Sequence, residues 1–517
     1  MSGETPAEQG GQSRRPRPWH TLLLAAYPVL FLYGANVGEV EPGQVWRPLA
    51  LAVAGACAVL AIAWLGTRDL IRSGLVATIA VVAFFAYGHV ANVLDAPSSV
   101  WLLAGWILVT VGLVALAVRR GARADAVTRG LNLLGVALVA VALVTAAPGA
   151  AAALGDDGPA PRTVTGASQA SRDAPDVYYL VLDRYASADT LKRLFGYDNS
   201  DFLSFLRARG FFVARDAHAN YLKTAQSLAS SLNMSYHHEE LAREYGPTSD
   251  NQLPIFERIT DHRVGREFTR RGYEYVHVGS WWEPTRTNPQ ADLNLGYGGA
   301  SDFVEVLTDT TILPAARSAL GLAASEEGPR RRHYVAGRAE LDALAGVADR
   351  PGPQFVFAHI LLPHDPYVFN RDGEFVPEAT ERSRMREENY VEQLRYLNAR
   401  LRVLITELTD RPEDRQPVIV LQSDEGPHPV RYTSGPGYDW RSAPRSDLRE
   451  KLEILNALRL PGVDTSALSD RISPVNTFRL ILNAYFDADL PLLEDHTYVF
   501  RGTSYFYDYA DVTDRLR

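Results

Sequence analysis

Five long apolar stretches lie in the first 150 residues, and they limit the architecture of this chain more than any other feature. They run at about residues 21–37, 48–66, 74–94, 99–118 and 131–147. Each approaches the roughly 20 apolar residues that a helix needs to cross the hydrocarbon core of a bilayer. A cleaved signal peptide would account for the first stretch but not for four more. The sequence therefore predicts five transmembrane helices over residues 21–147.

The charged residues between these stretches indicate how the helices are oriented. Arginines gather before the first stretch, between the second and third, and between the fourth and fifth, namely Arg14, Arg15, Arg17, Arg68, Arg72, Arg119, Arg120, Arg123 and Arg129. The other two connections carry Glu39, Glu41 and Asp95, with Arg47 as the one exception. Because basic loops stay in the cytoplasm, we expect a cytoplasmic tail at residues 1–20 and an extracytoplasmic location beyond residue 147.

One alternative changes this topology. If one apolar stretch is a buried helix instead of a span, the rest of the chain lies in the cytoplasm. The alternation of basic and non-basic loops favours five spans. Residues 148–174, which follow, are rich in Ala, Gly, Pro and Ser, a composition typical of flexible linkers.

The composition of the chain narrows the classes of partner. The 517 residues are too many for one compact domain. The net charge is -9 and no basic tract dominates residues 175–517, which argues against nucleic acid as a partner. Cys57 is the single cysteine, so disulfides contribute nothing to the fold.

The pattern of residues 175–517 is typical of an α/β fold. Short, nearly continuous apolar runs at residues 176–183, 273–280, 354–361 and 417–424 predict central strands that are covered on both faces. Helical patterns lie between them, most clearly over Met385–Leu408. Strands that alternate with helices predict a mostly parallel sheet between two helix layers, an α/β/α sandwich.

Charged residues follow several of these strands. Asp183 ends the first run, His364 and Asp365 follow the third, and Asp424 and Glu425 end the fourth. Ligands of such sheets bind beyond the carboxyl ends of the strands, so the fold would bring these residues to one edge. Carboxylate oxygens suit Mg²⁺, Mn²⁺ or Zn²⁺, and a divalent cation would relieve the repulsion between the adjacent acids.

Thr224 stands at the start of a predicted helix in "NYLKTAQSLASSLNM", which begins at Asn220. Two interpretations fit. The hydroxyl can act as an ordinary N-cap. It can instead be a nucleophile that attacks phosphorus or sulfur, with the helix N-terminus and Lys223 stabilising the transferred anionic group. The local sequence alone favours the cap.

The motifs and their order resemble those of the sulfatase-like branch of the alkaline phosphatase superfamily. The matching segments are "LVLDRY" at Asp183, "KTAQS" at Thr224, "HILLPHDPY" at His364, "QSDEG" at Asp424 and "SPVNTFRLILNAYF" at residues 473–486. With five apolar stretches in front, the layout is most similar to the lipoteichoic acid synthase and lipid A phosphoethanolamine transferase families. This resemblance covers nearly the whole chain.

The resemblance implies a fold, a site and a location. It implies an extracytoplasmic sulfatase-like catalytic domain at residues 175–517, anchored in a bacterial plasma membrane. Thr224 would be the nucleophile, and one divalent metal ion (Mn, Mg or Zn) would be held by Asp183, Thr224, Asp424 and Glu425. The residues that bind substrate or act as acid or base would be His364, His428 and Lys223.

Two departures from the family pattern bear on the chemistry. Glu425 stands where the family usually has a metal-binding histidine, and a carboxylate there would favour Mn²⁺ or Mg²⁺ over Zn²⁺. No C-x-P-x-R or S-x-P-x-R segment is present at the nucleophile. Because Thr224 cannot become formylglycine, we do not expect classical sulfate-ester hydrolysis.

The expected function is therefore transfer of a phosphoglycerol or phosphoethanolamine type head group. The donor would be a membrane lipid, the acceptor an envelope glycan or lipid, and the intermediate a phospho-threonine. A hydrolase or phosphodiesterase with the same site is an alternative, and a non-catalytic scaffold is a second. His359 lies inside a predicted strand and is interpreted as a packed core residue. Arg184 is interpreted either as a phosphate ligand or as a partner of a nearby acid.

Overall fold

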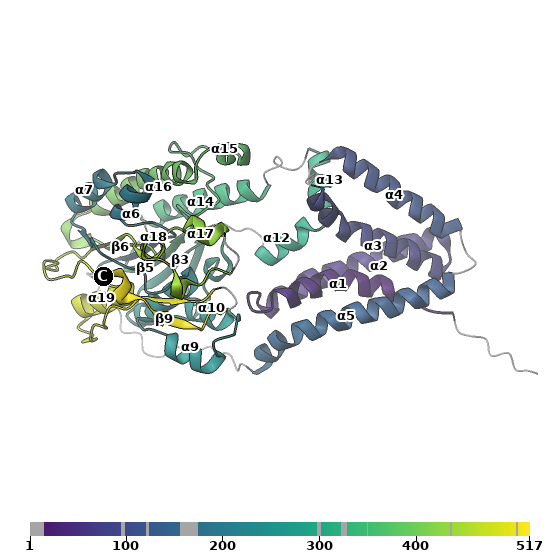
Figure 1. Cartoon of the computed structure of the whole chain (residues 1–517), viewed down its shortest axis with the longest axis horizontal. Helices are drawn as coiled ribbons and strands as arrows, with labels where there is room; N and C mark the ends of the chain where they lie inside the picture. Colours follow the sequence, from purple (N-terminus) through teal and green to yellow (C-terminus); the bar gives the residue numbers. More distant parts are fainter. Residues whose placement is uncertain are drawn as a thin grey trace, which may run out of the picture. The chain divides into compact units, whose positions relative to one another are not determined.

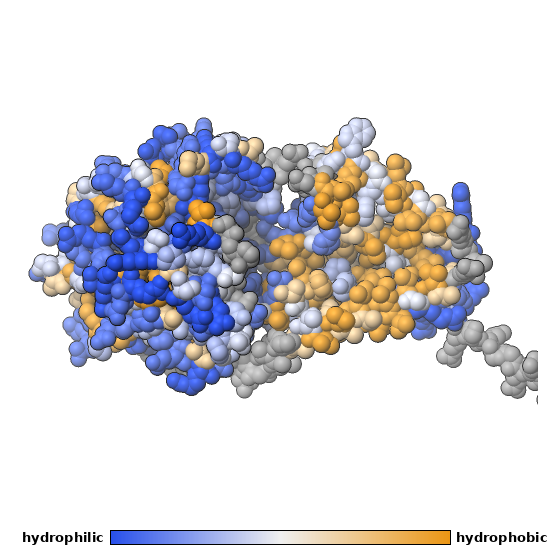
Figure 2. Space-filling view, in the orientation of Figure 1, coloured by the Kyte–Doolittle hydropathy of each residue, from blue (hydrophilic) through white to orange (hydrophobic). Residues whose placement is uncertain are grey.

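The computed structural model describes residues 15–94, 99–119, 124–155, 174–296, 301–321, 328–348, 350–434, 437–502 and 505–517. The chain forms two compact units. One contains Met1–Gly158 together with Asp302–Glu326, and the other contains Pro159–Ser301 together with Glu327–Arg517. Their surfaces differ in kind, since the helical unit is largely apolar and the second unit largely hydrophilic (Figure 2).

The helical unit contains the apolar stretches. Its helices are α1 (His20–Ala35), α2 (Trp46–Thr67), α3 (Leu70–Val93), α4 (Val100–Arg119) and α5 (Ala124–Gly155) (Figure 1). Among the described residues, four helical stretches are long and apolar enough to cross a membrane, at Pro42–Thr67, Leu70–Val93, Val100–Arg119 and Ala124–Ala147. The prediction of transmembrane helices is confirmed at this level.

Two details differ from the sequence-based expectation. The first apolar stretch forms α1, which has 16 residues and is shorter than a typical membrane span. Helix α5 continues to Gly155, so the first part of the predicted linker at 148–174 is helical. Residues 156–173 of that linker lie outside the described part of the chain.

A helical hairpin from the second half of the sequence belongs to the helical unit. It consists of α12 (Asp302–Asp309) and α13 (Leu313–Ala319). In a regular α-helix the Gly88 N–H would donate to the Phe84 carbonyl. Here Gly88 N–H donates to the Thr310 carbonyl (2.9 Å), and Phe84 O accepts from Ile312 N–H (2.9 Å). The hairpin is thus attached to α3 through the backbone of that helix.

Gly88 is the residue on which this attachment depends. A Cβ atom at this position would lie 2.1 Å from the Asp309 carbonyl oxygen. Gly88→Val should therefore separate the hairpin from α3 and destabilise the unit by about 1–3 kcal/mol, as overpacking usually does. Gly112→Val in α4 is the matched control, because nothing lies within 4 Å of a Cβ there. Thermal unfolding and amide hydrogen exchange of residues 302–321 check this, and equal results for both variants would contradict it.

The second unit contains a seven-stranded sheet in the order β2-β7-β6-β1-β5-β3-β4. The strands are β1 (Val177–Leu182), β2 (Phe212–Val213), β3 (Glu274–Gly279), β4 (Leu293–Gly296), β5 (Gln354–Ile360), β6 (Val418–Gln422) and β7 (Asn456–Arg459). Neighbours from β6 through β4 are parallel, and β7 is antiparallel to both β6 and β2. The predicted mostly parallel sheet is confirmed, as are its four predicted strands.

Both faces of the sheet are covered because successive side chains of a strand point to opposite sides. In β1, Val177, Tyr179 and Val181 join one hydrophobic cluster. The alternate side chains Tyr178, Leu180 and Leu182 join the other. This pattern explains why a central strand reads as a continuous apolar run in the sequence.

Helices that flank the sheet contribute to both clusters, for example through Leu228 to the first and Leu397 to the second. Those of the α/β unit are α6 (Ala188–Phe195), α7 (Ser200–Ala208), α8 (Thr224–Asn233), α9 (His238–Tyr245), α10 (Leu253–Thr260), α11 (Arg263–Arg270), α14 (Gly328–Val347), α15 (Glu378–Arg382), α16 (Arg386–Thr409), α17 (Val430–Ser434), α18 (Arg445–Leu452), α19 (Thr477–Phe486) and α20 (Thr513–Leu516). The helix predicted at Met385–Leu408 is α16. A small separate hairpin pairs β8 (Tyr498–Phe500) with β9 (Tyr509–Asp511).

Candidate active site

Three side chains converge at the carboxyl ends of the central strands. Asp183 follows β1 directly, Asp424 lies two residues beyond β6, and His359 is the second-last residue of β5. One possible ligand atom from each lies within 4.8 Å of the other two, and all three residues are buried. His359 Nε2 lies 3.8 Å from Asp183 Oδ2. The parallel order β6-β1-β5 places these strand ends side by side.

Hydrogen bonds between the two loops hold the acids together. The hydroxyl of Ser423 donates to the Leu182 carbonyl (2.7 Å) and accepts from the Tyr185 N–H (2.9 Å). The backbone N–H of Arg184 donates to Asp424 Oδ1 (3.4 Å). These hydrogen bonds join the loop after β1, which carries Asp183, to the loop after β6, which carries Asp424.

The buried polar atoms of this group fit a cation. Within the described part of the chain, Asp183 Oδ1, Asp424 Oδ2 and His359 Nε2 are buried and have no hydrogen-bond partner. Such atoms are costly unless something binds them. Burial raises the pKa of Asp183 well above its usual range, and the charge of Asp424 raises it further. Burial, and then the charge of Glu425, raises the pKa of Asp424 to about 7. A divalent cation would reverse these shifts.

The neighbours of His359 orient its ring. Its Nδ1 lies 3.0 Å from Thr285 Oγ1, which in turn lies 2.8 Å from Ser280 Oγ. We assign Nδ1 as the donor to Thr285, which leaves the Nε2 lone pair facing Asp183. Burial lowers the pKa of His359 to about 3, so the ring is neutral. A neutral imidazole fixed through its other nitrogen is the usual form of a histidine metal ligand.

Thr224 is the first residue of α8, and its N-cap is Lys223, whose side chain makes no capping bond. The threonine hydroxyl is therefore not the cap of this helix. It lies instead close to the Asp424 carboxylate, where it lowers the pKa that burial and then the charge of Glu425 raise. The first N–H groups of a helix have no partner inside the helix and favour anions. The Thr224 hydroxyl, the Asp424 carboxylate and the N-terminus of α8 thus lie close together.

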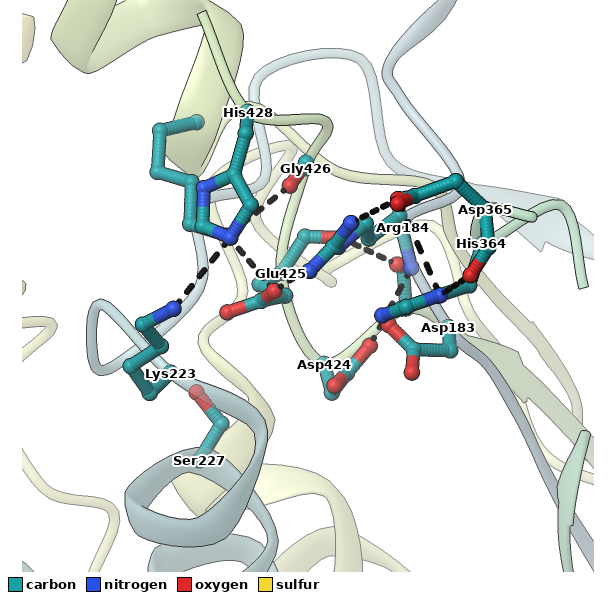
Figure 3. Close-up of polar contacts among 12 residues, drawn as sticks. Asp183, Arg184, Lys223, Ser227, His364, Asp365, Asp424, Glu425, Gly426 and His428 are labelled. Atoms are coloured by element: carbon teal, nitrogen blue, oxygen red, sulfur yellow. Dashed lines mark hydrogen bonds and ion pairs between the residues drawn. The ribbon is translucent and has the colours of Figure 1, made fainter. Parts of the chain in front are cut away.

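Two of the other predicted residues form a pair beside Thr224. Lys223 Nζ lies 3.2 Å from His428 Nε2 (Figure 3). Lys223 also lies 5.3 Å from the centre of the Tyr432 ring. Burial, together with the nearby charge of Lys451, lowers the pKa of His428 well below its usual value. The imidazole is consequently neutral, and Lys223 is the cation of the pair.

His364 lies on the far side of the acids, at the loop after β5 (Figure 3). Its Nδ1 bonds the Asp365 carbonyl, and its own carbonyl accepts from Gln393 Nε2 (2.8 Å). Burial, and then the charge of Arg184, lowers its pKa to about 3. The ring of Trp281 lies 6.2 Å away, edge to face. His364 is thus a fixed, neutral side chain.

Glu425 faces two cations. Its Oε1 lies 2.6 Å from Lys451 Nζ and 3.2 Å from Arg184 Nε. Burial alone would raise its pKa, but Lys451 and then Arg184 outweigh burial and lower it to about 2. Arg184 also pairs with Asp365. Among the described residues, the group whose ligand atoms lie together is Asp183, His359 and Asp424, and Glu425 is not a member.

Sequence reasoning missed two residues of this site. His359 was interpreted as core packing because it lies within an apolar strand, yet its place one residue from the strand's end is a signal that could have identified it. Lys451 carries no such signal, because it lies near the end of α18 and reaches Glu425 only through the fold. The predicted residues Asp183, Asp424 and Glu425 do lie in one region of the α/β unit (Figure 3), and Thr224 is close enough to Asp424 to affect the pKa of that group.

Comparison with known proteins identifies the family. The model of the Sulfatase family matches residues 176–452, which is more than half of the chain. The chain therefore belongs to the sulfatase family, and the resemblance stated from its motifs is confirmed. No curated protein is similar enough to count as a relative.

Solved structures with a similar arrangement include phosphoethanolamine transferases. The C-terminal periplasmic domain of EptC from Escherichia coli, solved in complex with Zn, has 12% identity and a TM-score of 0.43; the match covers 65% of this chain and 92% of that one. The integral membrane lipooligosaccharide phosphoethanolamine transferase A (EptA) from Neisseria meningitidis has 14% identity and a TM-score of 0.37, covering 91% and 95%. The periplasmic domain of EptC from Campylobacter jejuni has 13% identity and a TM-score of 0.36, covering 62% and 92%.

Proposed function

We propose that this chain is a membrane-anchored, metal-dependent phosphotransferase. It moves a phospho-alcohol head group, of the phosphoglycerol or phosphoethanolamine type, from a membrane lipid to an envelope glycan or lipid. The transferred group is carried on Thr224. The observation that supports this most directly is the Thr224 hydroxyl, which starts α8 and lies close to Asp424 of the Asp183–His359–Asp424 group.

Two displacement steps make up the reaction. Thr224 Oγ1 attacks the phosphorus of the lipid head group and passes its proton to Asp424. The bond from phosphorus to the lipid oxygen breaks, and this oxygen takes the proton that Thr224 gave to Asp424. An acceptor hydroxyl then attacks the phospho-threonine, the Thr224–phosphorus bond breaks, and the proton of the acceptor hydroxyl passes through Asp424 to the Thr224 oxygen. The helix N-terminus favours the anionic phosphoryl group throughout.

The remaining polar residues bind and orient the substrate. Lys223 places a positive charge beside the attacking hydroxyl, where it attracts phosphoryl oxygens. His428 and His364 are neutral, so each contributes to hydrogen bonding with these oxygens or with the leaving alcohol. Arg184 is already paired with Glu425 and Asp365, which favours its interpretation as an ion-pair partner.

Asp183, Asp424 and His359 are the residues that would hold a divalent cation. When bound, such a cation lowers the pKa of a hydroxyl near it and offsets phosphoryl charge. Two carboxylates with one imidazole suit Zn²⁺ and Mn²⁺ better than Mg²⁺, which prefers oxygen ligands. The expectation that the site favours Mn²⁺ or Mg²⁺ over Zn²⁺ depended on Glu425 as a ligand. Glu425 does not belong to the group whose ligand atoms lie together.

The helical unit supports a membrane anchor with five crossings. α1 is short, but His20, Ala25, Val29 and Tyr33 are buried within the unit, as expected of a helix that lies inside a bundle. We propose that α1 crosses the bilayer with the four longer helices. The N-terminus would then be cytoplasmic and the α/β unit extracytoplasmic. A membrane anchor keeps the site close to a lipid donor and so raises its effective concentration.

Mass spectrometry of the purified full chain tests this function. After incubation with vesicles of phosphatidylethanolamine or phosphatidylglycerol, we expect a covalent adduct on the peptide that contains Thr224. Its mass identifies the transferred head group, and Thr224→Ala should carry none. An adduct on another residue, or release of lipid product without any adduct, would contradict the proposed intermediate.

The same experiment separates the alternative reactions. If the adduct decays at the same rate with and without an acceptor glycan or lipid, water is the acceptor and the chain is a phosphodiesterase. A classical sulfatase is disfavoured, because the only cysteine, Cys57, lies in α2 and a threonine occupies the nucleophile position. A scaffold would neither bind a divalent cation nor form an adduct.

A further inference from the structure

A buried ion pair lies next to the three residues that would hold the cation. Lys451 Nζ and Glu425 Oε1 are 2.6 Å apart, and the two side chains are 0% and 1% exposed. Burying two charges costs desolvation energy that their attraction often fails to recover, so a pair like this is weak evidence for stability. Its position beside Asp424 indicates a role in the site instead.

The backbone holds the pair in one arrangement. The Gly426 N–H donates to the Lys451 carbonyl (2.7 Å), and Lys451 Nζ donates to the Gly426 carbonyl (3.2 Å). A Cβ at Gly426 would lie 2.3 Å from the Glu450 carbonyl oxygen, so only glycine allows this approach. The loop after β6 is therefore fastened to the end of α18, with Glu425 turned toward Lys451.

The ion pairs near the site involve two of its four carboxylates. Four carboxylates lie here, on Asp183, Asp365, Asp424 and Glu425 (Figure 3). Arg184 pairs with Asp365 and Glu425, and Lys451 pairs with Glu425. Glu425 and Asp365 therefore have protein cations as ion-pair partners. Asp183 and Asp424 lie instead with neutral His359, and one possible ligand atom from each of these three residues lies within 4.8 Å of the other two.

The backbone conformation of Arg184 also supports different roles for Asp424 and Glu425. Its φ angle is +63°, in the left-handed region that an arginine rarely adopts. This conformation directs its N–H to Asp424 Oδ1 while its Nε reaches Glu425. Arg184, in this strained conformation, therefore contacts Asp424 and Glu425 through different groups, so that the two acids can have different roles.

We propose that Lys451 is a positioning residue that pairs with Glu425 and so keeps this carboxylate out of the ligand set of the cation. Asp183, His359 and Asp424 then hold one cation, and Lys451 supplies the positive charge that pairs with Glu425. This rests on the proposed function only in that the site binds a divalent cation. The pairing of Lys451 with Glu425 explains why two adjacent acids after β6 can have different roles, Asp424 as a ligand of the cation and Glu425 as an ion-pair partner.

Cation binding by the full chain in detergent tests the proposal without any lipid substrate. Titration with Mn²⁺ or Zn²⁺ gives the affinity of each variant. Glu425→Gln should change that affinity less than threefold, because Glu425 is not a ligand. Lys451→Met should tighten Mn²⁺ binding at least tenfold, because the freed carboxylate can now coordinate. Glu425→Gln combined with Lys451→Met removes both charges and should return the affinity to within threefold of the natural chain.

Several outcomes would overturn it. A loss of a hundredfold or more in Glu425→Gln makes Glu425 a ligand. A folded Lys451→Met variant with unchanged or weaker Mn²⁺ binding removes the positioning role. If Lys451→Met fails to fold, the single Glu425→Gln and the double variant still decide between ligand and counter-ion. Failure of lipid transfer with normal cation binding would count against the proposed function alone.

Discussion

Replacing Thr224 by alanine should lower the rate of head-group transfer from a labelled phospholipid by about 10⁴-fold or more, as removal of a covalent nucleophile usually does. Thr224 starts α8 and its hydroxyl lies close to Asp424, so alanine removes the attacking oxygen. Alanine is also the best helix former, which leaves α8 intact. The variant should bind a divalent cation and unfold at nearly the same temperature as the natural chain.

Two further variants give this prediction its controls. Thr224→Ser keeps the oxygen and should retain most of the transfer. Ser227→Ala removes a hydroxyl one turn further along α8, where it donates to the Tyr221 carbonyl (3.1 Å). It should cost about 1 kcal/mol of stability and leave transfer in place. Full activity of Thr224→Ala, or equal losses in Thr224→Ala and Ser227→Ala, would rule out Thr224 as nucleophile.

The parts of the site that the sequence predicts are those that follow a strand or start a helix. Asp183 and Asp424 come directly after short apolar runs, and the edge rule for parallel sheets brings them together. Thr224 precedes a helical pattern, so its place at a helix start was also predictable. These signals are local, because each depends on a few neighbouring residues.

Other features depend on contacts that no local pattern encodes. Lys451 belongs to a helix that begins 20 residues after Glu425, and the pair forms only when α18 packs against the loop after β6. The hairpin at 302–319 has no long apolar run, yet it joins the helical unit through Gly88 and Phe84. His359 is hidden among apolar neighbours, so only its partner Thr285 and the adjacent Asp183 distinguish it from packing.

Removing the carboxylate of Asp424, one of the two acids that would hold the cation, should also have a large effect on cation binding. Asp424→Asn should weaken binding of Mn²⁺ or Zn²⁺ by about 10²-fold or more, since even supporting residues of a metal site cost 10- to 100-fold. Transfer should fall with it. Asp176→Asn is the matched control, because Asp176 is a largely buried acid at the other end of β1 that pairs with Arg411 (3.2 Å). Its cation affinity should not change.

The pH dependence of cation binding follows from the same acid and gives a second test. Burial and the charge of Glu425 raise the pKa of Asp424 from 3.8 to about 7, so below pH 7 a proton occupies the carboxylate that the cation needs. Affinity should rise as pH increases through about 7 and continue to rise above that value, because Asp183, whose pKa burial also raises, must lose its proton as well.

Stability of the metal-free chain should change in the opposite direction. Because the folded-state pKa of Asp424 exceeds the unfolded value, this group stabilises the fold at low pH, and that contribution is lost as pH rises through about 7. Added Mn²⁺ should restore the melting temperature above pH 7 in the natural chain and in Asp176→Asn, but not in Asp424→Asn. Restoration in all three would place the cation elsewhere, because the ion would then not need the carboxylate whose proton it displaces.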